Sequence, residues 1–342
     1  MARAASLASA GELALVERLA ARFPGSGRGV TVGIGDDAAV CTPDPGGRTL
    51  LTTDVMVEGV HFDLALTTPR QLGFKLVSVN VSDLYAMGGR PRHLLLTFAL
   101  PRQTTLAFFD ALLDGVADAA ARYGVSVVGG DLSGTPGPMD LGATAVGHAR
   151  KPILRSTAMP GDSIYVTGPL GDSAAGRAVL GHMAHARIRP ADARSERMRL
   201  PAGLPAWGVV RPCVERHLCP VARRPSAAMV RAATAMIDLS DGLMIDLGRL
   251  ARASGAGARV ELGRVPVSGG LAAVAAALGL DSLGLALGGG EDYELLYTAR
   301  PGVRVPGRRI GQITAEPGLT GVDKAGRVRT LKAEGYTHFG GG

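Results

Sequence analysis

The chain has 342 residues, with an apolar content of 46% and an aromatic content of only 4%. This length exceeds the usual size of one hydrophobic core, so we expect two domains. No apolar run reaches the length of a membrane span, and the sequence therefore predicts a protein with no membrane partner.

The net charge of +7 would suit a nucleic-acid partner, but the charge is local. Residues 181–234 contain ten Arg, no Lys and three acids, which accounts for the whole excess. Trp207 is the only aromatic side chain there for stacking on bases, so an Arg-rich surface element is favoured over nucleic-acid binding. Cys41, Cys213 and Cys219 fit no zinc spacing and are typical of a reduced, cytoplasmic protein.

The N-terminal segment is predicted to form an amphipathic helix. Ser9 and Glu12 fit a capping box, and Leu13, Val16 and Leu19 follow at helical spacing. A transit peptide is the alternative, but such peptides are poor in acids.

A dense set of oxygen ligands follows. Two apolar runs, residues 38–40 and 49–52, are predicted to be strands around a Pro- and Gly-rich turn at residues 43–47. The strand ends carry Asp36, Asp37, Thr52, Thr53 and Asp54. Crowded carboxylates repel one another unless a cation compensates, and hard oxygen ligands suit Mg²⁺. Solvated acids at hairpin ends are the alternative interpretation.

The rest of the first half alternates helices and strands. We expect helices at residues 70–87 and 104–123 and strands at 93–100 and 141–148. Asp83 lies near the end of the first helix, where an acid opposes the helix dipole. A further strand is predicted to run into a Gly-Gly-Asp turn at residues 129–131, where glycine lets the backbone approach a ligand. This alternation predicts a mixed α/β or α+β fold.

The second half is expected to begin near Lys151, giving an N-terminal domain of residues 1–150 and a C-terminal domain of residues 151–342. A strand at residues 163–167 precedes a helix, and residues 182–212, rich in Arg and Pro, are predicted to form an exposed, irregular insertion. Another helix is predicted to start at Asp238 or Ser240, so that Asp238 and Asp241 share a face beside an anion-binding helix end. Capping by these acids is the alternative.

Several common nucleotide and hydrolase motifs are missing. Gly-Lys never occurs as a dipeptide, which excludes a Walker-type phosphate loop. Gly33-x-Gly35 followed by two Asp is a poor dinucleotide fingerprint, because Ala38 replaces the third glycine. No Ser/His/Asp hydrolase pattern stands out.

Taken together, motifs along nearly the whole chain resemble the thiamine-monophosphate kinase family, within the ATP-binding superfamily of aminoimidazole ribonucleotide synthetase. In chain order the motifs are Gly33-Ile-Gly-Asp-Asp-Ala, Thr52-Thr-Asp, Glu58-Gly-Val-His-Phe, Val79-Asn-Val-Ser-Asp-Leu-Tyr-Ala-Met-Gly, Val128-Gly-Gly-Asp, Gly168-Pro-Leu-Gly-Asp-Ser-Ala-Ala-Gly, Ile237-Asp-Leu-Ser-Asp-Gly-Leu and Gly289-Gly-Glu-Asp-Tyr-Glu-Leu. The Arg- and Pro-rich stretch at 182–212 departs from the family and contains none of these motifs.

The resemblance implies a phosphotransferase that converts thiamine monophosphate and ATP into thiamine diphosphate, with several Mg²⁺ ions. It also implies a two-domain synthetase-like fold and a homodimer whose N-terminal domains pair their sheets. The implied metal ligands are Asp37, Thr52, Thr53, Asp54, Asp83, Asp131, Asp238 and Asp241. The implied ATP contacts are Tyr123, Gly130, Asp131, Arg155 and Ser240. The implied contacts to thiamine phosphate are His61, Glu291 and Phe339.

The residues are consistent with this chemistry. A phosphate acceptor is already an anion and needs no general base, so no side-chain nucleophile or base is expected; the difficulty is the repulsion between two anions, which metal ions relieve. The thiazolium cation would favour Glu291, and Phe339 could stack on a ring. His61, Tyr123 and Phe339 could equally be structural.

Other functions stay open at this point. A selenophosphate synthetase needs a reactive Cys near the N-terminus, whereas Cys41 follows the Asp pair, and a hydrogenase maturation factor ends in Cys, whereas this sequence ends in three Gly. Aminoimidazole ribonucleotide synthetase itself is a further alternative. A non-catalytic nucleotide- or RNA-binding module is the alternative from a different class.

Overall fold

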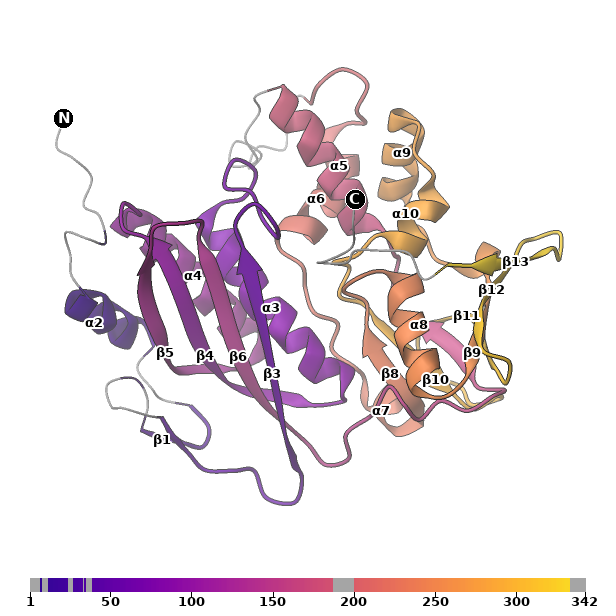
Figure 1. Ribbon diagram of the computed structural model, residues 1–342, viewed down its shortest axis with the longest axis horizontal. Helices are drawn as coiled ribbons and strands as arrows, with labels where there is room; N and C mark the ends of the chain where they lie inside the picture. Colours follow the sequence, from indigo (N-terminus) through magenta and orange to yellow (C-terminus); the bar gives the residue numbers. More distant parts are fainter. Residues whose placement is uncertain are drawn as a thin grey trace. The chain divides into compact units, whose positions relative to one another are not determined.

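The computed structural model describes residue 7 and residues 12–23, 27–32, 34, 39–186 and 200–332 (Figure 1). The chain divides into two compact units, Met1–Leu84 with Gly89–Pro152, and Tyr85–Gly88 with Ile153–Gly342. Each unit combines a sheet with helices, which confirms the expected mixed α+β class.

The first unit is built on the four-stranded sheet β3-β6-β4-β5, in which only the β4–β5 pair is parallel. In chain order its elements are α2 (Glu12–Arg22), β1 (Val30–Val32), β2 (Val40–Cys41), β3 (Arg48–Val57), α3 (Pro69–Ala86), β4 (Arg90–Pro101), α4 (Leu106–Tyr123), β5 (Ser126–Thr135) and β6 (Asp140–Ala149).

Helices α3 and α4 cover one face of this sheet, and no helix of the described residues covers the opposite face, called the open face below (Figure 1). The helices cross closely because a Cβ on Gly73 would lie 2.0 Å from the Leu112 carbonyl oxygen, and one on Gly115 would lie 1.9 Å from that of Arg70. Helix α4 is also well capped: the Thr105 hydroxyl accepts the Phe108 N–H, and Gly124 ends the helix in the left-handed conformation. The predicted helices in this half are confirmed to within two residues.

Two predictions for the first unit are corrected. Strand β3 continues to Val57, so residues 52–54 lie within the strand and not at its end. Strand β5 likewise runs through residues 129–131, where a turn was expected. A Cβ on Gly130 would lie 1.9 Å from the Leu96 carbonyl oxygen, so the close approach that requires glycine there is to strand β4.

The second unit contains, among its described residues, a seven-stranded sheet in the order β13-β12-β9-β11-β7-β10-β8, in which only β9 and β12 pair in parallel. In chain order its elements are β7 (Ser163–Val166), α5 (Asp172–His185), α6 (Trp207–Leu218), α7 (Ala227–Ala232), β8 (Ala233–Asp238), α8 (Leu243–Ala253), β9 (Gly257–Glu261), η2 (Leu262–Arg264), α9 (Gly269–Leu278), α10 (Ser282–Gly288), β10 (Leu295–Ala299), β11 (Arg308–Thr314), β12 (Gly318–Val322) and β13 (Val328–Leu331).

Helical structure reaches into the predicted irregular stretch, residues 182–212, from both sides. Helix α5 continues to His185, and α6 begins at Trp207 and contains Pro212. The buried side chains of Trp207 and Cys213 hold α6 in place, and a Cβ on Gly176 of α5 would lie 2.1 Å from the Cys213 carbonyl oxygen. The expectation of irregular structure is therefore corrected at both ends, while residues 187–199 lie outside the described residues.

No single helix of the described chain is long and apolar enough to cross a membrane. Helices α9 and α10 meet that criterion only as a pair, and the pair is bent by 119°.

Candidate functional site

The first group of predicted ligands lies between strand β3 and helix α3. The Thr52 hydroxyl donates a hydrogen bond to Asp83 Oδ2 over 2.5 Å. One turn earlier on α3, the buried Asn80 accepts the backbone N–H of Asp54 at its Oδ1, over 3.1 Å. Thr52 and Asp54 are two residues apart on the strand and face the same side, so three of the predicted ligands, Thr52, Asp54 and Asp83, are brought together here.

The strand register places Asp131 elsewhere. Asp54 is paired with Ala143, which is paired with the buried Leu96, so Asp54 lies on the helix-covered face. Asp131 is paired with the exposed Thr97, one position further along, and therefore lies on the open face. Its neighbour Gly130 is paired with Leu96 on strand β4.

Thr53 also lies on the open face, because side chains alternate along a strand. Its hydroxyl donates to the Ala143 carbonyl oxygen over 3.0 Å and accepts a hydrogen bond from the Thr144 hydroxyl over 3.2 Å. These two contacts tie β3 to β6.

His61 closes the turn that follows β3. Its Nδ1 accepts the backbone N–H of Val57 over 2.9 Å, and Glu58 Oε2 accepts the N–H of Met139 over 3.0 Å. Because Nδ1 is an acceptor, the exchangeable proton of a neutral imidazole is on Nε2. The turn thus presents His61 in one defined tautomer.

Tyr123, at the end of α4, packs against α3. Its hydroxyl lies 2.9 Å from that of Ser78, and its ring centroid lies 6.4 Å from that of Phe74. Arg155, another predicted ATP contact, is exposed in a turn of the second unit, where its carbonyl oxygen accepts the Ser254 hydroxyl. Asp37 and Phe339 lie outside the described residues.

In the second unit, the segment 238–242 is a connection and not the start of a helix. Asp238 is the buried last residue of β8, and α8 begins only at Leu243, after Gly242 with φ 114°. Asp238 and Asp241 therefore do not share a helical face, which corrects the expectation from their spacing. The positive φ of Gly242, and the 2.8 Å that would separate its Cβ from the Gly288 carbonyl oxygen, explain why the helix starts late.

Asp246 on α8 holds this connection together. Its Oδ2 accepts the backbone N–H groups of Asp241 and Gly242, over 3.0 and 3.1 Å. Arg249 bridges Asp241 and Asp246 by an ion pair to each. Burial and the nearby Asp241 raise the pKa of Asp246 to about 6, against the lowering effect of these hydrogen bonds and of Arg249.

The loop at residues 289–294 carries Glu291 in a strained backbone. Glu291 and Tyr293 have φ values of 63° and 50°, which non-glycine residues adopt at a cost of roughly 1–3 kcal/mol each. The loop is tied to the 238–242 connection, since the N–H of Glu291 donates to the Ser240 carbonyl oxygen over 2.7 Å and that of Tyr293 to Leu239 over 3.0 Å. Predicted residues Ser240, Asp241 and Glu291 thus lie on adjoining segments.

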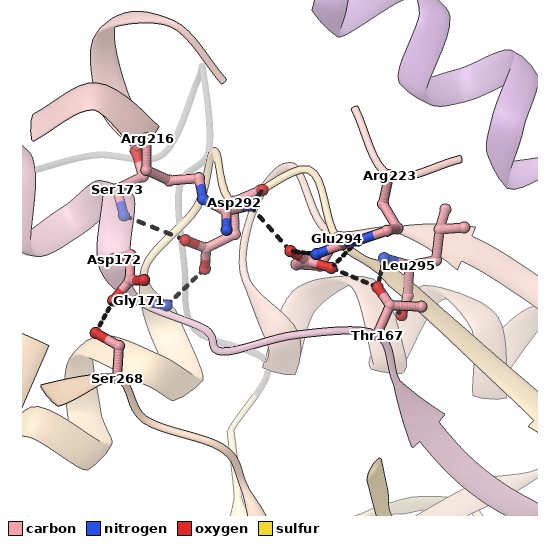
Figure 2. A network of polar contacts seen from close by, with 10 residues as sticks. All are labelled: Thr167, Gly171, Asp172, Ser173, Arg216, Arg223, Ser268, Asp292, Glu294 and Leu295. Atoms are coloured by element: carbon pink, nitrogen blue, oxygen red, sulfur yellow. Dashed lines mark hydrogen bonds and ion pairs between the residues drawn. The ribbon is translucent and has the colours of Figure 1, made fainter. Parts of the chain in front are cut away.

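Two buried carboxylates of this loop, those of Asp292 and Glu294, hold it in place (Figure 2). Asp292 accepts the backbone N–H groups of Gly171 and Ser173, over 2.6 and 3.2 Å, at the start of α5. Burial raises the pKa of Asp292 to about 7, even though these two hydrogen bonds lower it. Strained backbone and a perturbed carboxyl in one loop are typical of functional sites.

Glu294 is fully buried and accepts hydrogen bonds from three side chains (Figure 2). Thr167 donates over 2.5 Å, Arg216 over 3.0 Å, and Arg223 twice over 2.8 Å. A Cβ on Gly168 would lie 2.6 Å from the Glu294 carboxylate. The motifs that begin at Gly168 and Gly289 are therefore in close contact in the folded protein.

Sequence reasoning missed Asn80, Asp246, Arg216, His217 and Arg223. Asn80 could have been found as a polar residue within an apolar helical pattern. Asp246 has local partners, the N–H groups of Asp241 and Gly242 and the side chain of Arg249. Arg216, His217 and Arg223 carry no such signal, because their partners lie on other segments. A pocket of about 470 Å³ also opens on the second unit's sheet, and no predicted site residue lines it. Its lining residues are Arg259, Glu261, Gly263, Arg264, Arg309, Gln312, Val322, Asp323 and Lys324.

The donor set between β3 and α3 suits a hard cation. No group of three or more His, Cys, Asp or Glu side chains in the described part of the chain is arranged as a metal site. Mg²⁺, however, usually binds through one or two carboxylates together with water and substrate phosphates. The pair Asp54 and Asp83, with Thr52, therefore fits Mg²⁺ better than a metal held by protein ligands alone.

Comparison with known proteins gives a consistent result. Residues 35–149 match the family described as AIR synthase related protein, N-terminal domain. The thiamine-monophosphate kinase of Escherichia coli (strain K12) is 36% identical over 342 aligned residues, covering 96% of this chain and 98% of that protein.

Solved structures agree with this similarity. The crystal structure of thiamine-monophosphate kinase from Stenotrophomonas maltophilia K279a is 31% identical, with a TM-score of 0.75, and the match covers 91% of this chain and 96% of that one. AaThiL complexed with AMPPCP and TMP is 29% identical, with a TM-score of 0.74, covering 96% and 97%.

Proposed function

The chain belongs to the thiamine-monophosphate kinase family, and we propose that it transfers the γ-phosphoryl group of ATP directly to thiamine monophosphate, forming thiamine diphosphate. The observation that carries this proposal is the 36% identity to a thiamine-monophosphate kinase over almost the full length of both chains. Sister enzymes of the superfamily and a non-catalytic binding module are disfavoured by the same observation.

The reaction needs positioning and charge neutralisation more than acid–base chemistry. The acceptor is a phosphate monoester that is already anionic at neutral pH, so no side chain has to remove a proton from it. A covalent phosphoenzyme would relieve no protonation problem, and both phosphates must be present together for transfer. We therefore propose in-line displacement without a side-chain nucleophile or base. AaThiL complexed with AMPPCP and TMP supports simultaneous binding.

We propose that the protein binds several Mg²⁺ ions through carboxylate and hydroxyl oxygens. The proposed ligands are Asp37, Thr52, Thr53, Asp54, Asp83, Asp131, Asp238 and Asp241. When bound, Mg²⁺ supplies charge neutralisation between the two phosphate groups and orients their oxygens. The contact of Thr52 with Asp83 supports this group best, because it holds one carboxylate beside Asp54.

For the nucleotide we propose contacts from Tyr123, Gly130, Asp131, Arg155 and Ser240. We divide the chain into an N-terminal ATP- and magnesium-binding domain, residues 1–150, and a C-terminal domain, residues 151–342.

For thiamine phosphate we propose contacts from His61, Glu291 and Phe339. Glu291 is supported by its side chain, which is 29% exposed on a strained loop and carries the charge that a thiazolium cation requires.

We also propose a homodimer in which the open faces of the four-stranded sheets pair. That face exposes apolar side chains, since Leu51, Val55 and Leu95 are 72%, 49% and 37% exposed. Such a face on a monomer is costly to leave in water. Asp131 lies on the same face, so this pairing would bring it to the subunit interface.

A cytoplasmic location is proposed from the three cysteines. Cys41, Cys213 and Cys219 are all free thiols, which is typical of proteins kept in a reducing compartment.

An acceptor panel tests the proposed function. Purified protein with ATP and MgCl₂ is given thiamine phosphate, thiamine or selenide, and the products are separated by chromatography. We expect thiamine diphosphate and ADP in equal amounts with thiamine phosphate alone. Unchanged thiamine phosphate together with phosphorylation of another acceptor would overturn the assignment.

A further inference from the structure

The last turn of α6 contacts the Glu291 loop through two consecutive residues. Arg216 donates to the Asp292 carbonyl oxygen over 2.9 Å and to Glu294 over 3.0 Å, and so supports the backbone. His217 instead contacts the side chain of Glu291, with 3.1 Å between Nδ1 and Oε2. The same Nδ1 lies 3.0 Å from the Ser173 hydroxyl oxygen at the start of α5.

These two distances determine where the imidazole proton lies. A carboxylate oxygen has no proton to donate, so a bare Nδ1 would set two lone pairs against each other. The proton must therefore be on Nδ1, and His217 donates it toward Glu291. The Ser173 hydroxyl oxygen, 3.0 Å from the same nitrogen, faces this N–H as a second acceptor. The side chain of His217 is 16% exposed and that of Glu291 is 29% exposed, so the carboxylate stays accessible to a ligand.

We propose that His217 is a positioning residue that orients the Glu291 carboxylate toward the cationic ring of the acceptor. The inference rests on the proposed function, in which Glu291 meets the thiazolium. A glutamate side chain has several rotamers, and binding a cation through it requires that one of them be selected. The N–H of His217 selects this rotamer of Glu291 before the ligand binds, so less of the binding free energy is lost in ordering the Glu291 side chain.

This assignment also gives a role to α6, which begins inside the Arg- and Pro-rich stretch and extends beyond it. Glu291 is already constrained by its backbone, with φ 63°, and by its N–H bond to Ser240. The carboxylate itself is constrained by His217. Selectivity for a phosphate ester that carries a positive ring thus depends on a helix outside the family motifs.

The test compares His217→Ala, His217→Asn and Glu291→Gln with the wild type. We expect His217→Ala to raise KM for thiamine phosphate about tenfold, which corresponds to about 1.4 kcal/mol, while kcat and KM for ATP stay within about twofold. Asn offers an N–H close to the position of Nδ1, so His217→Asn should restore most of the lost affinity. His182→Ala on α5 is the matched control, because His182 is an exposed histidine whose ring contacts only its own helix among the described contacts.

A neutral-ring analogue separates positioning from general structural damage. The probe is thiamine phosphate with its thiazolium replaced by an uncharged ring, used as a competitive inhibitor. Positioning predicts that His217→Ala weakens the charged ligand and leaves the neutral one unchanged. Equal weakening of both ligands would contradict the inference, as would failure of Asn to rescue.

The outcomes distinguish this inference from the function on which it rests. Wild-type protein that does not turn over thiamine phosphate would overturn both. An active wild type with a raised KM in Glu291→Gln and a normal KM in His217→Ala would overturn the inference alone. A double variant, His217→Ala with Glu291→Gln, should be no worse than Glu291→Gln, because each change removes the same interaction.

Discussion

Replacing Glu294 with Gln, which has nearly the same shape, should strongly destabilise the second unit. The Glu294 carboxylate is fully buried and accepts four hydrogen bonds from Thr167, Arg216 and Arg223. Gln keeps the shape but offers one acceptor oxygen, and it turns an amide N–H₂ group toward donors. At least two hydrogen bonds are lost, and two guanidinium groups lose their counter-charge.

The expected magnitude is about 3 kcal/mol in the free energy of unfolding. Removing one partner of a buried ion pair costs about 3–5 kcal/mol. The lower end applies because the side chain of Arg223 is 45% exposed and can be rehydrated, whereas that of Arg216 is only 20% exposed. At about 2–4 °C per kcal/mol for a domain of this size, the melting temperature should fall by about 6–12 °C.

Differential scanning calorimetry of the full chain measures this change, with Glu261→Gln as control. Glu261 also forms ion pairs with two arginines, Arg264 and Arg309, but its side chain is 35% exposed. Loss of its charge should therefore lower the free energy of unfolding by less than about 1 kcal/mol. A Glu294→Gln protein that melts within 2 °C of the wild type (roughly 0.5–1 kcal/mol) would refute the reasoning.

The pH dependence supplies a second check on Glu294. Burial alone would raise its pKa, but the hydrogen bonds from Arg223 and Thr167 and the charges of Arg223 and Arg216 outweigh burial and lower it below 4.5. A lowered pKa stabilises the native state above the unfolded value, and this contribution is lost as the pH falls through the folded value. The difference between variant and wild type should therefore be constant near neutral pH and shrink below about pH 4.5.

Three further predictions concern activity and packing. Asp54→Asn and Asp131→Asn should each lower turnover by orders of magnitude with little loss of fold, since each removes a charge proposed to hold Mg²⁺; near-normal activity at limiting Mg²⁺ would remove that residue from the ligand set. Replacing residues 187–199 by a Gly/Ser linker should leave kinase activity intact, because the segment contains no family motif, and loss of activity in a folded protein would place it in the site. Gly115→Val should destabilise the first unit by several kcal/mol, because its Cβ would lie 1.9 Å from the Arg70 carbonyl oxygen, and thermal melting near wild type would contradict that crossing.

Local sequence signals predicted the first unit well. Helical periodicity located α3 and α4, because the spacing of apolar residues acts within a few residues along the chain. The prediction was wrong where tertiary contacts override local preference. Asp54 was expected to end its strand, but its N–H is satisfied by Asn80 and the strand continues beside β6.

The site in the second unit was harder to predict for the same reason. The segment containing Asp238 and Asp241 has a good helical pattern, yet α8 starts later because the 238–242 connection packs on the 289–294 loop. Glu294 could be recognised only as part of a family motif, since Thr167, Arg216 and Arg223 come from three other segments. No spacing rule relates residues that meet only after folding.

The stereochemistry of transfer tests the central claim most directly. ATP with a chiral, isotopically labelled γ-phosphate is incubated with the protein, Mg²⁺ and thiamine phosphate, and the configuration at the transferred phosphorus is determined in the product. Direct transfer predicts labelled thiamine diphosphate with inversion. Net retention, or labelled protein formed from ATP without thiamine phosphate, would contradict it.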